Sequence, residues 1–180
     1  SHAQDSFWSW RQLMYRFAAQ LGPAQLEAIA TGLYVEMLEA GYTSVCEFHY
    51  LHHDAQGQAY ADPAEMSLSL LRAAQRTGIG MTLLPVLYQN SGFGGGAPTA
   101  GQSRFIHSTE AMLRLLERLR PACDAQSARL GLAPHSLRAV TPESLREALD
   151  LDPNQLPAYV ALVHLALAQG RNEEATRNLK

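Results

Sequence analysis

The sequence predicts an α/β fold: parallel βα units forming part of a (β/α)8 barrel, followed by a helical C-terminal extension. Short apolar or β-branched segments alternate with helical segments at roughly 30–50 residues per unit, which is typical of right-handed βαβ units. Polar side chains follow each of three expected strands directly, as they do at the functional end of a (β/α) barrel. Because eight units normally need about 250 residues, the expected barrel is incomplete.

Composition narrows the classes of protein. Of 180 residues, 47% are apolar and 17% are charged, which excludes a disordered chain and allows one domain with its own core. A net charge of −3 without a basic block excludes nucleic-acid binding driven by phosphate neutralisation. No apolar run approaches the roughly 18 residues of a membrane span. We therefore expect neither a nucleic-acid partner nor a membrane.

The cysteine content and the first residues of the chain indicate a cellular location and a fragment. Cys46 and Cys123 are too few for a disulfide framework, so a reducing, cytoplasmic location is expected. Cys46 is predicted to be a buried, inert strand residue. The chain starts at Ser1-His2-Ala3 without an initiating Met or a secretory signal, which indicates a fragment.

Two helices and a strand are expected first. A cap at Asp5 or Ser6 begins a helix that runs to about Leu21, and both of its tryptophans are expected to be packing residues. Pro23 begins a second helix that ends at Gly41. The β-branched and aromatic run Thr43–Tyr50 then predicts a strand. The apolar face of the first helix comprises Phe7, Trp10, Leu13, Met14 and Phe17.

The middle of the chain repeats this alternation. A polar segment, 52–61, precedes a helix from Asp62-Pro63 to Gly78. The continuous apolar run Met81–Leu87 fits a strand covered on both faces. The loop 88–103 is too long to be a simple connector. Its glycine run lacks phosphate-loop spacing, which favours a flexible lid over a phosphate cradle.

The last elements are weaker. Ser108 can cap a helix, Leu130–Ala133 is expected as a weak third strand, and Thr141-Pro142 opens a further helix. From Ala148 the pattern resembles a single tetratricopeptide unit, so we divide the chain into a barrel part, 1–148, and a helical hairpin, 149–180. Other alanine- and leucine-rich hairpins share this pattern, and a working repeat array needs about three units.

Two histidine-containing segments are candidates for chemistry. His49, His52 and His53 follow the first strand and could ligate a metal, but local hydrogen bonding is favoured, since no helical His-x-x-x-His or cysteine pair accompanies them. After the third strand, Arg138 lies close to His135, and a guanidinium fork suits carboxylates. A plain surface role for that arginine stays open.

Four motifs taken together resemble formimidoylglutamate deiminase, an amidohydrolase-superfamily enzyme of histidine degradation. They are Asp-Ser-Phe-Trp-Ser-Trp-Arg at 5–11, Glu-Phe-His-Tyr-Leu-His-His at 47–53, Leu-Pro-Val-Leu-Tyr at 84–88 with Ser-Gly-Phe-Gly-Gly at 91–95, and His-Ser-Leu-Arg-Ala-Val at 135–140. The resemblance runs in order from about Asp5 to Ala148.

The resemblance implies a zinc-dependent hydrolase of non-peptide carbon–nitrogen bonds, converting N-formimino-L-glutamate and water to N-formyl-L-glutamate and ammonia. By the same resemblance, Arg11, Tyr50, His135 and Arg138 match positions that hold the dicarboxylate substrate. His2 would match one zinc ligand if Ser1-His2-Ala3 corresponds to the end of the family's His-Ser-His motif.

The family's other zinc ligands and its catalytic glutamate have no counterparts, and Val163-His164-Leu165 stands where a His-x-His motif is expected. We therefore expect no catalytic residue, weak zinc binding and no activity from this chain alone. One alternative is a non-catalytic interaction module that uses the C-terminal hairpin, and another is a remnant that binds dicarboxylates without hydrolysing them. Open sheet edges favour self-association.

Overall fold

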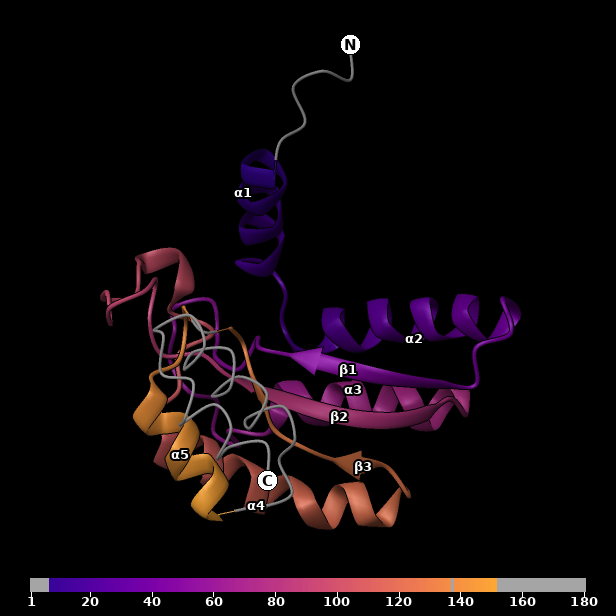
Figure 1. Ribbon diagram of the computed structural model, residues 1–180. Coiled ribbons are helices and arrows are strands. Elements are labelled where there is room, and N and C mark those ends of the chain that lie inside the picture. Colours follow the sequence, from indigo (N-terminus) through magenta and orange to yellow (C-terminus); the bar gives the residue numbers. More distant parts are fainter. Residues whose placement is uncertain (1–6, 137, 152–180) are drawn as a thin grey trace.

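The computed structural model describes residues 7–136 and 138–151 (Figure 1). Helices and strands alternate after an N-terminal helical pair, as expected. The elements are α1 (Phe7–Ala18), α2 (Pro23–Glu39), β1 (Ser44–His49), α3 (Glu65–Thr77), β2 (Gly80–Leu87), the 3-10 helix η2 (Ala100–Gln102), α4 (Thr109–Ala125), β3 (Arg129–Leu130), β4 (Ala133–Pro134) and α5 (Pro142–Leu151).

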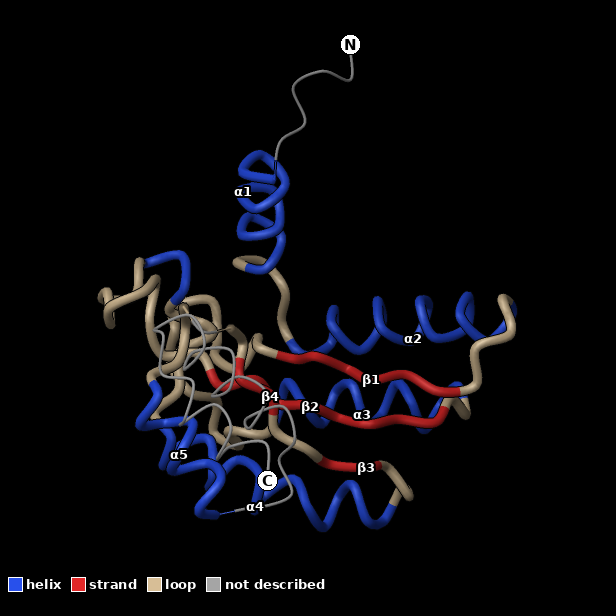
Figure 2. Tube along the Cα trace, in the orientation of Figure 1, coloured by secondary structure: helices blue, strands red, loops and turns tan. Residues whose placement is uncertain are grey.

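The strands form a parallel sheet. β2 is central, with β1 on one side and both β3 and β4 on the other, and every pairing is parallel. Figure 2 shows the red strands side by side, with helices running along the sheet. The predicted α/β class with parallel βα units is therefore confirmed for the described part of the chain. Closure into a barrel stays a prediction.

The single strand predicted over Leu130–Ala133 is divided into two short strands. Leu83 pairs with Leu130 and Val86 with Ala133, so β3 and β4 share one register along β2. The break follows from Gly131, because glycine favours interruption of a strand. A Cβ at Gly131 would lie 2.8 Å from Leu84 Cδ2, so this close approach also suits glycine.

The core lies between the sheet and the helices α2, α3 and α4. Side chains from three elements, among them Leu71, Leu83 and Leu119, are completely buried there. α2 is joined to β1 through Tyr34, whose hydroxyl donates a hydrogen bond to Glu47 Oε2 at 2.7 Å. The same helices leave the opposite face of β1 open, and Phe48 on that face is exposed.

Cys46 is exposed on this open face, so the prediction of a buried cysteine is wrong. A strand alternates its side chains between two faces, and only the face that carries Glu47 and His49 is covered by helices. β2 meets the expectation of double coverage at its carboxyl end, where Val86 and Leu87 are buried, but Thr82 and Leu84 are half-buried.

Helix α1 stands clear of the sheet (Figure 1). Trp10 and Phe17 are 57% and 61% exposed, so the prediction that Trp10 packs is wrong for the described structure. The reason is geometric, because none of the described helices or strands covers this side of α1. The Trp8 side chain lies outside the described residues.

Three sequence-based expectations concern residues outside the described part. They are the zinc ligand His2, the histidine His164 and the helical hairpin of 149–180, of which only the start falls in α5. α5 runs continuously across the expected boundary between 148 and 149. Among the described residues, no helix has the length and apolar character needed to cross a membrane.

Candidate functional site

The carboxyl ends of the strands bring three aromatic rings together. Tyr50 follows β1, Tyr88 follows β2 and His135 follows β4, and parallel strands end at the same edge of a sheet. His135 N donates to the carbonyl of Leu87 at 3.0 Å, which fixes it beside the end of β2. Its ring centroid lies 5.3 Å from that of Tyr50 and 4.4 Å from that of Tyr88.

Two arginines reach this edge from different segments. Arg11 extends from α1, where its Nε and Nη2 donate to the Tyr15 hydroxyl at 3.1 and 2.8 Å. Arg138 lies in the turn after His135. Both guanidinium charges act on His135, so the structure brings Arg11, Tyr50, His135 and Arg138 together at one place.

His135 is kept neutral. Burial, followed by the positive charges of Arg138 and Arg11, lowers the pKa of His135 to about 4. An uncharged imidazole at pH 7 can donate or accept a hydrogen bond but adds no positive charge of its own. The resulting group of two cationic forks, a neutral imidazole and tyrosine hydroxyls suits an anion with more than one carboxylate.

Tyr88 and Tyr15 also belong to this group, although sequence reasoning did not select them as site residues. Burial raises the pKa of Tyr88, and Arg11 and Arg138 partly offset this effect. The amide of the buried Gln102 donates to the Tyr88 hydroxyl at 2.7 Å. Two signals could have identified these tyrosines: Tyr88 immediately follows a strand, and Tyr15 is four positions after Arg11 on a helix.

Four histidines form a second cluster, which comprises those at the end of β1 and in the loop that follows it, together with His107. The ring centroids of His49 and His52 are 5.2 Å apart, and His107 lies 4.4 Å from His52 and 4.7 Å from His53. Three of the four are buried, and His53 is half-buried. His52 Nε2 lies 3.1 Å from the carbonyl of Val86, so local hydrogen bonding accounts for one nitrogen of that ring. Its Nδ1 is buried without a hydrogen-bond partner among the described residues, as are His49 Nε2, His53 Nδ1 and His107 Nδ1.

Every histidine of this cluster resists protonation. Burial is the main cause and lowers the pKa of His49 to about 3 and of His107 to about 4, with neighbouring imidazoles adding to the effect. The pKa values of His52 and His53 are lowered for the same reason. No three His, Cys, Asp or Glu side chains among the described residues are arranged to hold a metal ion. The four rings are therefore uncharged at neutral pH.

The glycine-rich loop after β2 is folded on itself. Ser91 N donates to the carbonyl of Gly96 at 2.9 Å, and Gly94 and Gly95 adopt positive φ angles that other residues disfavour. Phe93, which directly precedes these two glycines, is 74% exposed. The role of this loop as a lid stays a prediction.

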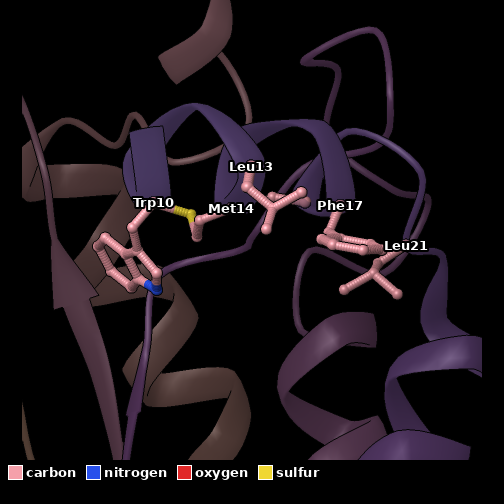
Figure 3. Close-up of a pocket in the computed structure, with 6 residues that line it drawn as sticks. Trp10, Leu13, Met14, Phe17 and Leu21 are labelled. Carbon is pink, nitrogen blue, oxygen red and sulfur yellow. The ribbon is translucent and has the colours of Figure 1, made fainter. Parts of the chain in front are cut away.

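A pocket on α1 differs in character from the polar site. It is lined entirely by hydrophobic side chains, as Figure 3 shows, and offers no charged group to an anion. Its lining residues are Trp10, Leu13, Met14, Phe17, Ala18 and Leu21. The candidate site for a dicarboxylate is therefore the edge with His135, and not this pocket.

Comparisons with known proteins agree with the motifs. The chain is 54% identical over 169 residues to formimidoylglutamate deiminase from Pseudomonas aeruginosa, an alignment that covers 94% of this chain and 36% of that protein. The resemblance recognised in the sequence is thus confirmed across nearly the whole chain, which spans about a third of the length of its curated relative. No protein-family profile matches the chain.

Solved structures show the same relationship. The structure of an amidohydrolase from Brucella melitensis superposes with a TM-score of 0.80 at 52% identity, covering 85% of this chain and 34% of that one. A triazine hydrolase from Arthobacter aurescens superposes with a TM-score of 0.64 at 16% identity, over 83% of this chain and 33% of its own. The second likeness shows a shared fold alone.

Proposed function

We propose that this chain is part of a formimidoylglutamate deiminase and carries the substrate-binding side of its active site. The reaction would be hydrolysis of N-formimino-L-glutamate to N-formyl-L-glutamate and ammonia. Similarity over 94% of the chain supports the assignment. The chain would then contribute part of a (β/α)8 barrel, with β1, β2 and the β3–β4 strand as consecutive barrel strands.

One observation carries the proposal: the half-buried His135 ring packs against Tyr50 and Tyr88 at one strand edge, where the charges of Arg138 and Arg11 act on it. Two cationic groups facing one aromatic-walled site match the two carboxylates of a glutamate derivative. In this arrangement each arginine binds a carboxylate, while Tyr50 and His135 donate hydrogen bonds to the remaining oxygens. The rings of Tyr50, Tyr88 and Phe105 exclude water from one side of the ligand.

Zinc does not fit the described residues. The resemblance implies a zinc hydrolase, yet the described ranges contain no three side chains placed to ligate a metal ion. The one expected ligand, His2, lies outside those ranges. We therefore assign no step of hydrolysis to these residues and limit their role to binding and orienting the substrate.

The proposal is tested by titrating the chain with N-formyl-L-glutamate and following binding by calorimetry or NMR. Because the site is open and the arginines are partly solvated, we expect a Kd no tighter than about 1 mM, or about −4 kcal/mol. Arg138→Met should weaken binding, whereas the surface control Arg114→Met, which removes only an exposed pair with Glu110, should not. Equal affinity in both variants would contradict the proposal.

Hydrolysis is tested separately with N-formimino-L-glutamate and a coupled ammonia assay. The isolated chain should release no ammonia above background, with or without added zinc. Zinc-dependent turnover that is abolished by His135→Ala would show that the catalytic groups are present after all.

Two further expectations stay predictions. The reducing, cytoplasmic location rests on the cysteine content alone, with both cysteines free in the described structure. Self-association is expected from open sheet edges, and light scattering as a function of concentration tests it. The tetratricopeptide-like hairpin, on which a role as an interaction module depends, lies outside the described residues.

A further inference from the structure

Helix α1 carries Arg11 but has little support from the other helices and strands, which raises the question of what holds it. α1 projects from the body of the molecule, and its apolar side is largely exposed (Figure 1). Only its C-terminal part joins a hydrophobic cluster, through Tyr15 and Ala18, together with Leu21 in the segment that follows α1. The position of Arg11 therefore depends on how the end of α1 is attached.

The attachment is made largely by Arg104, in the segment after η2. Arg104 is 4% exposed, and its guanidinium donates to backbone carbonyls only. Nη1 donates to Ala18 at the end of α1, Nη2 to Leu21 at 2.7 Å and Nε to His53 at 2.9 Å. One buried side chain thus connects the carboxyl end of α1 to the loop that follows β1.

The backbone of the same residue completes the connection. The carbonyl of Arg104 accepts hydrogen bonds from His52 N at 2.9 Å and His53 N at 3.1 Å. The next residue, Phe105, is buried and packs against Tyr15 of α1 at 5.8 Å and against Tyr50 of the site at 5.1 Å. Residues 104 and 105 therefore lie between α1 and the site.

The chemistry of arginine suits this task. The last carbonyls of a helix lack partners within the helix and carry partial negative charge, so a cation placed there satisfies and stabilises them. A planar guanidinium fork can bind three carbonyls through three separate nitrogens, as Arg104 does with Ala18, Leu21 and His53. Lysine would keep the charge but could not reproduce this geometry.

We propose that Arg104 is a positioning residue that seats α1 so that Arg11 reaches the dicarboxylate site. Arg11 lies seven residues before Ala18, roughly 10 Å along the helix axis. A tilt of about 15° about that end would move Arg11 by about 3 Å, which is enough to break its hydrogen bonds to a ligand. The functional part of this inference rests on the proposed function, but the seating of α1 does not.

The seating is tested without any ligand. The chain contains two tryptophans, Trp8 and Trp10, and both lie in α1, so tryptophan fluorescence anisotropy reports the motion of this helix. Arg104→Met should lower the anisotropy and speed tryptic cleavage after Arg16, whereas Arg114→Met should change neither. Unchanged anisotropy and cleavage in a folded Arg104→Met chain would overturn the proposal. Should Arg104→Met fail to fold, Arg104→Lys provides the same comparison with the charge retained.

The positioning role is tested by a double-mutant cycle with N-formyl-L-glutamate. Arg104→Met and Arg11→Met should each weaken binding by roughly tenfold, and the double variant should be no weaker than Arg11→Met alone. Additive losses would show that Arg104 does not act through Arg11. If neither the unaltered chain nor any variant binds the ligand, but Arg104→Met still lowers the tryptophan anisotropy, the proposed function fails and the proposed attachment of α1 stands.

Discussion

Acidification should destabilise this fold steeply, because three buried histidines must stay neutral in the folded chain. Burial holds the pKa of His49 near about 3 and of His107 near about 4, and that of His52 lies well below its usual value. The unfolded chain takes up protons at these residues near a pKa of about 6.5. Stability from these groups is therefore complete above that value and is lost as the pH falls below it.

The magnitude follows from the linkage of proton uptake to folding. Between pH 7.0 and 5.5, His49 and His107 each lower the free energy of unfolding by about 1.3 kcal/mol, so together they lower it by about 2.5 kcal/mol. This is a sizeable part of the 5–15 kcal/mol typical of a folded domain. The charged groups that face the cluster are Arg104, which disfavours protonation of His53, and Asp54, which favours it. His52, whose shift is taken as a direction only, and the half-buried His53 and His135 are left out of the sum.

Urea denaturation followed by circular dichroism at pH 7.0 and 5.5 measures the effect. With a slope of about 2 kcal/mol per molar urea, the midpoint should fall by about 1.3 M. His107→Gln replaces one ring by an amide that is not protonated in this pH range, so it should remove about 1.3 kcal/mol of the pH dependence. A midpoint that is constant or rises on acidification would refute the reasoning.

Other predictions concern packing and reactivity. Gly57→Ala should lower the free energy of unfolding by more than about 1 kcal/mol, measured by urea denaturation, because Gly57 has a φ of +78° and a new Cβ would lie 2.7 Å from Ser103 Cβ. Leu119→Ala should cost about 2–5 kcal/mol in the same assay, since Leu119 is completely buried. Burial raises the pKa of Cys123 to about 11, whereas Cys46 is exposed, so a thiol reagent at pH 8 should modify Cys46 first and Cys123 only on unfolding.

Local signals in the sequence accounted for most of the fold. Alternating β-branched and apolar runs predicted β1 and β2 to within a residue or two, and Ser108 is indeed the cap of α4, accepting a hydrogen bond from Ala111 N at 3.1 Å. Errors arose where burial depends on neighbours distant in sequence. Cys46 has the pattern of a core strand residue, but one face of β1 has no cover among the described residues.

The site residues also separate into those that local sequence signals predict and those that depend on contacts distant in the sequence. Tyr50 and His135 follow predicted strands, so their meeting at one edge could be anticipated from parallel topology alone. Arg11 could be selected only by resemblance. Hydrophobic periodicity predicts that α1 is a helix, but it does not predict where the helix lies, because α1 is attached through Arg104, which is distant in the sequence. The link from Arg104 to backbone carbonyls leaves no trace in the sequence, since any peptide group can accept such a bond.

Burial is the main cause of neutrality in both histidine environments, and the two differ in the charges that add to it. In the buried cluster, loss of water is the main cause that keeps the rings neutral, so acid acts on the whole fold. At His135 the positive charges of Arg138 and Arg11 add to the effect of burial. A bound dicarboxylate would screen those charges and favour protonation of His135, whereas it would leave the main cause of neutrality at His49 and His52 unchanged. Ligand binding is therefore coupled to protonation of His135, whereas acid unfolding depends on that ring and on the buried cluster together.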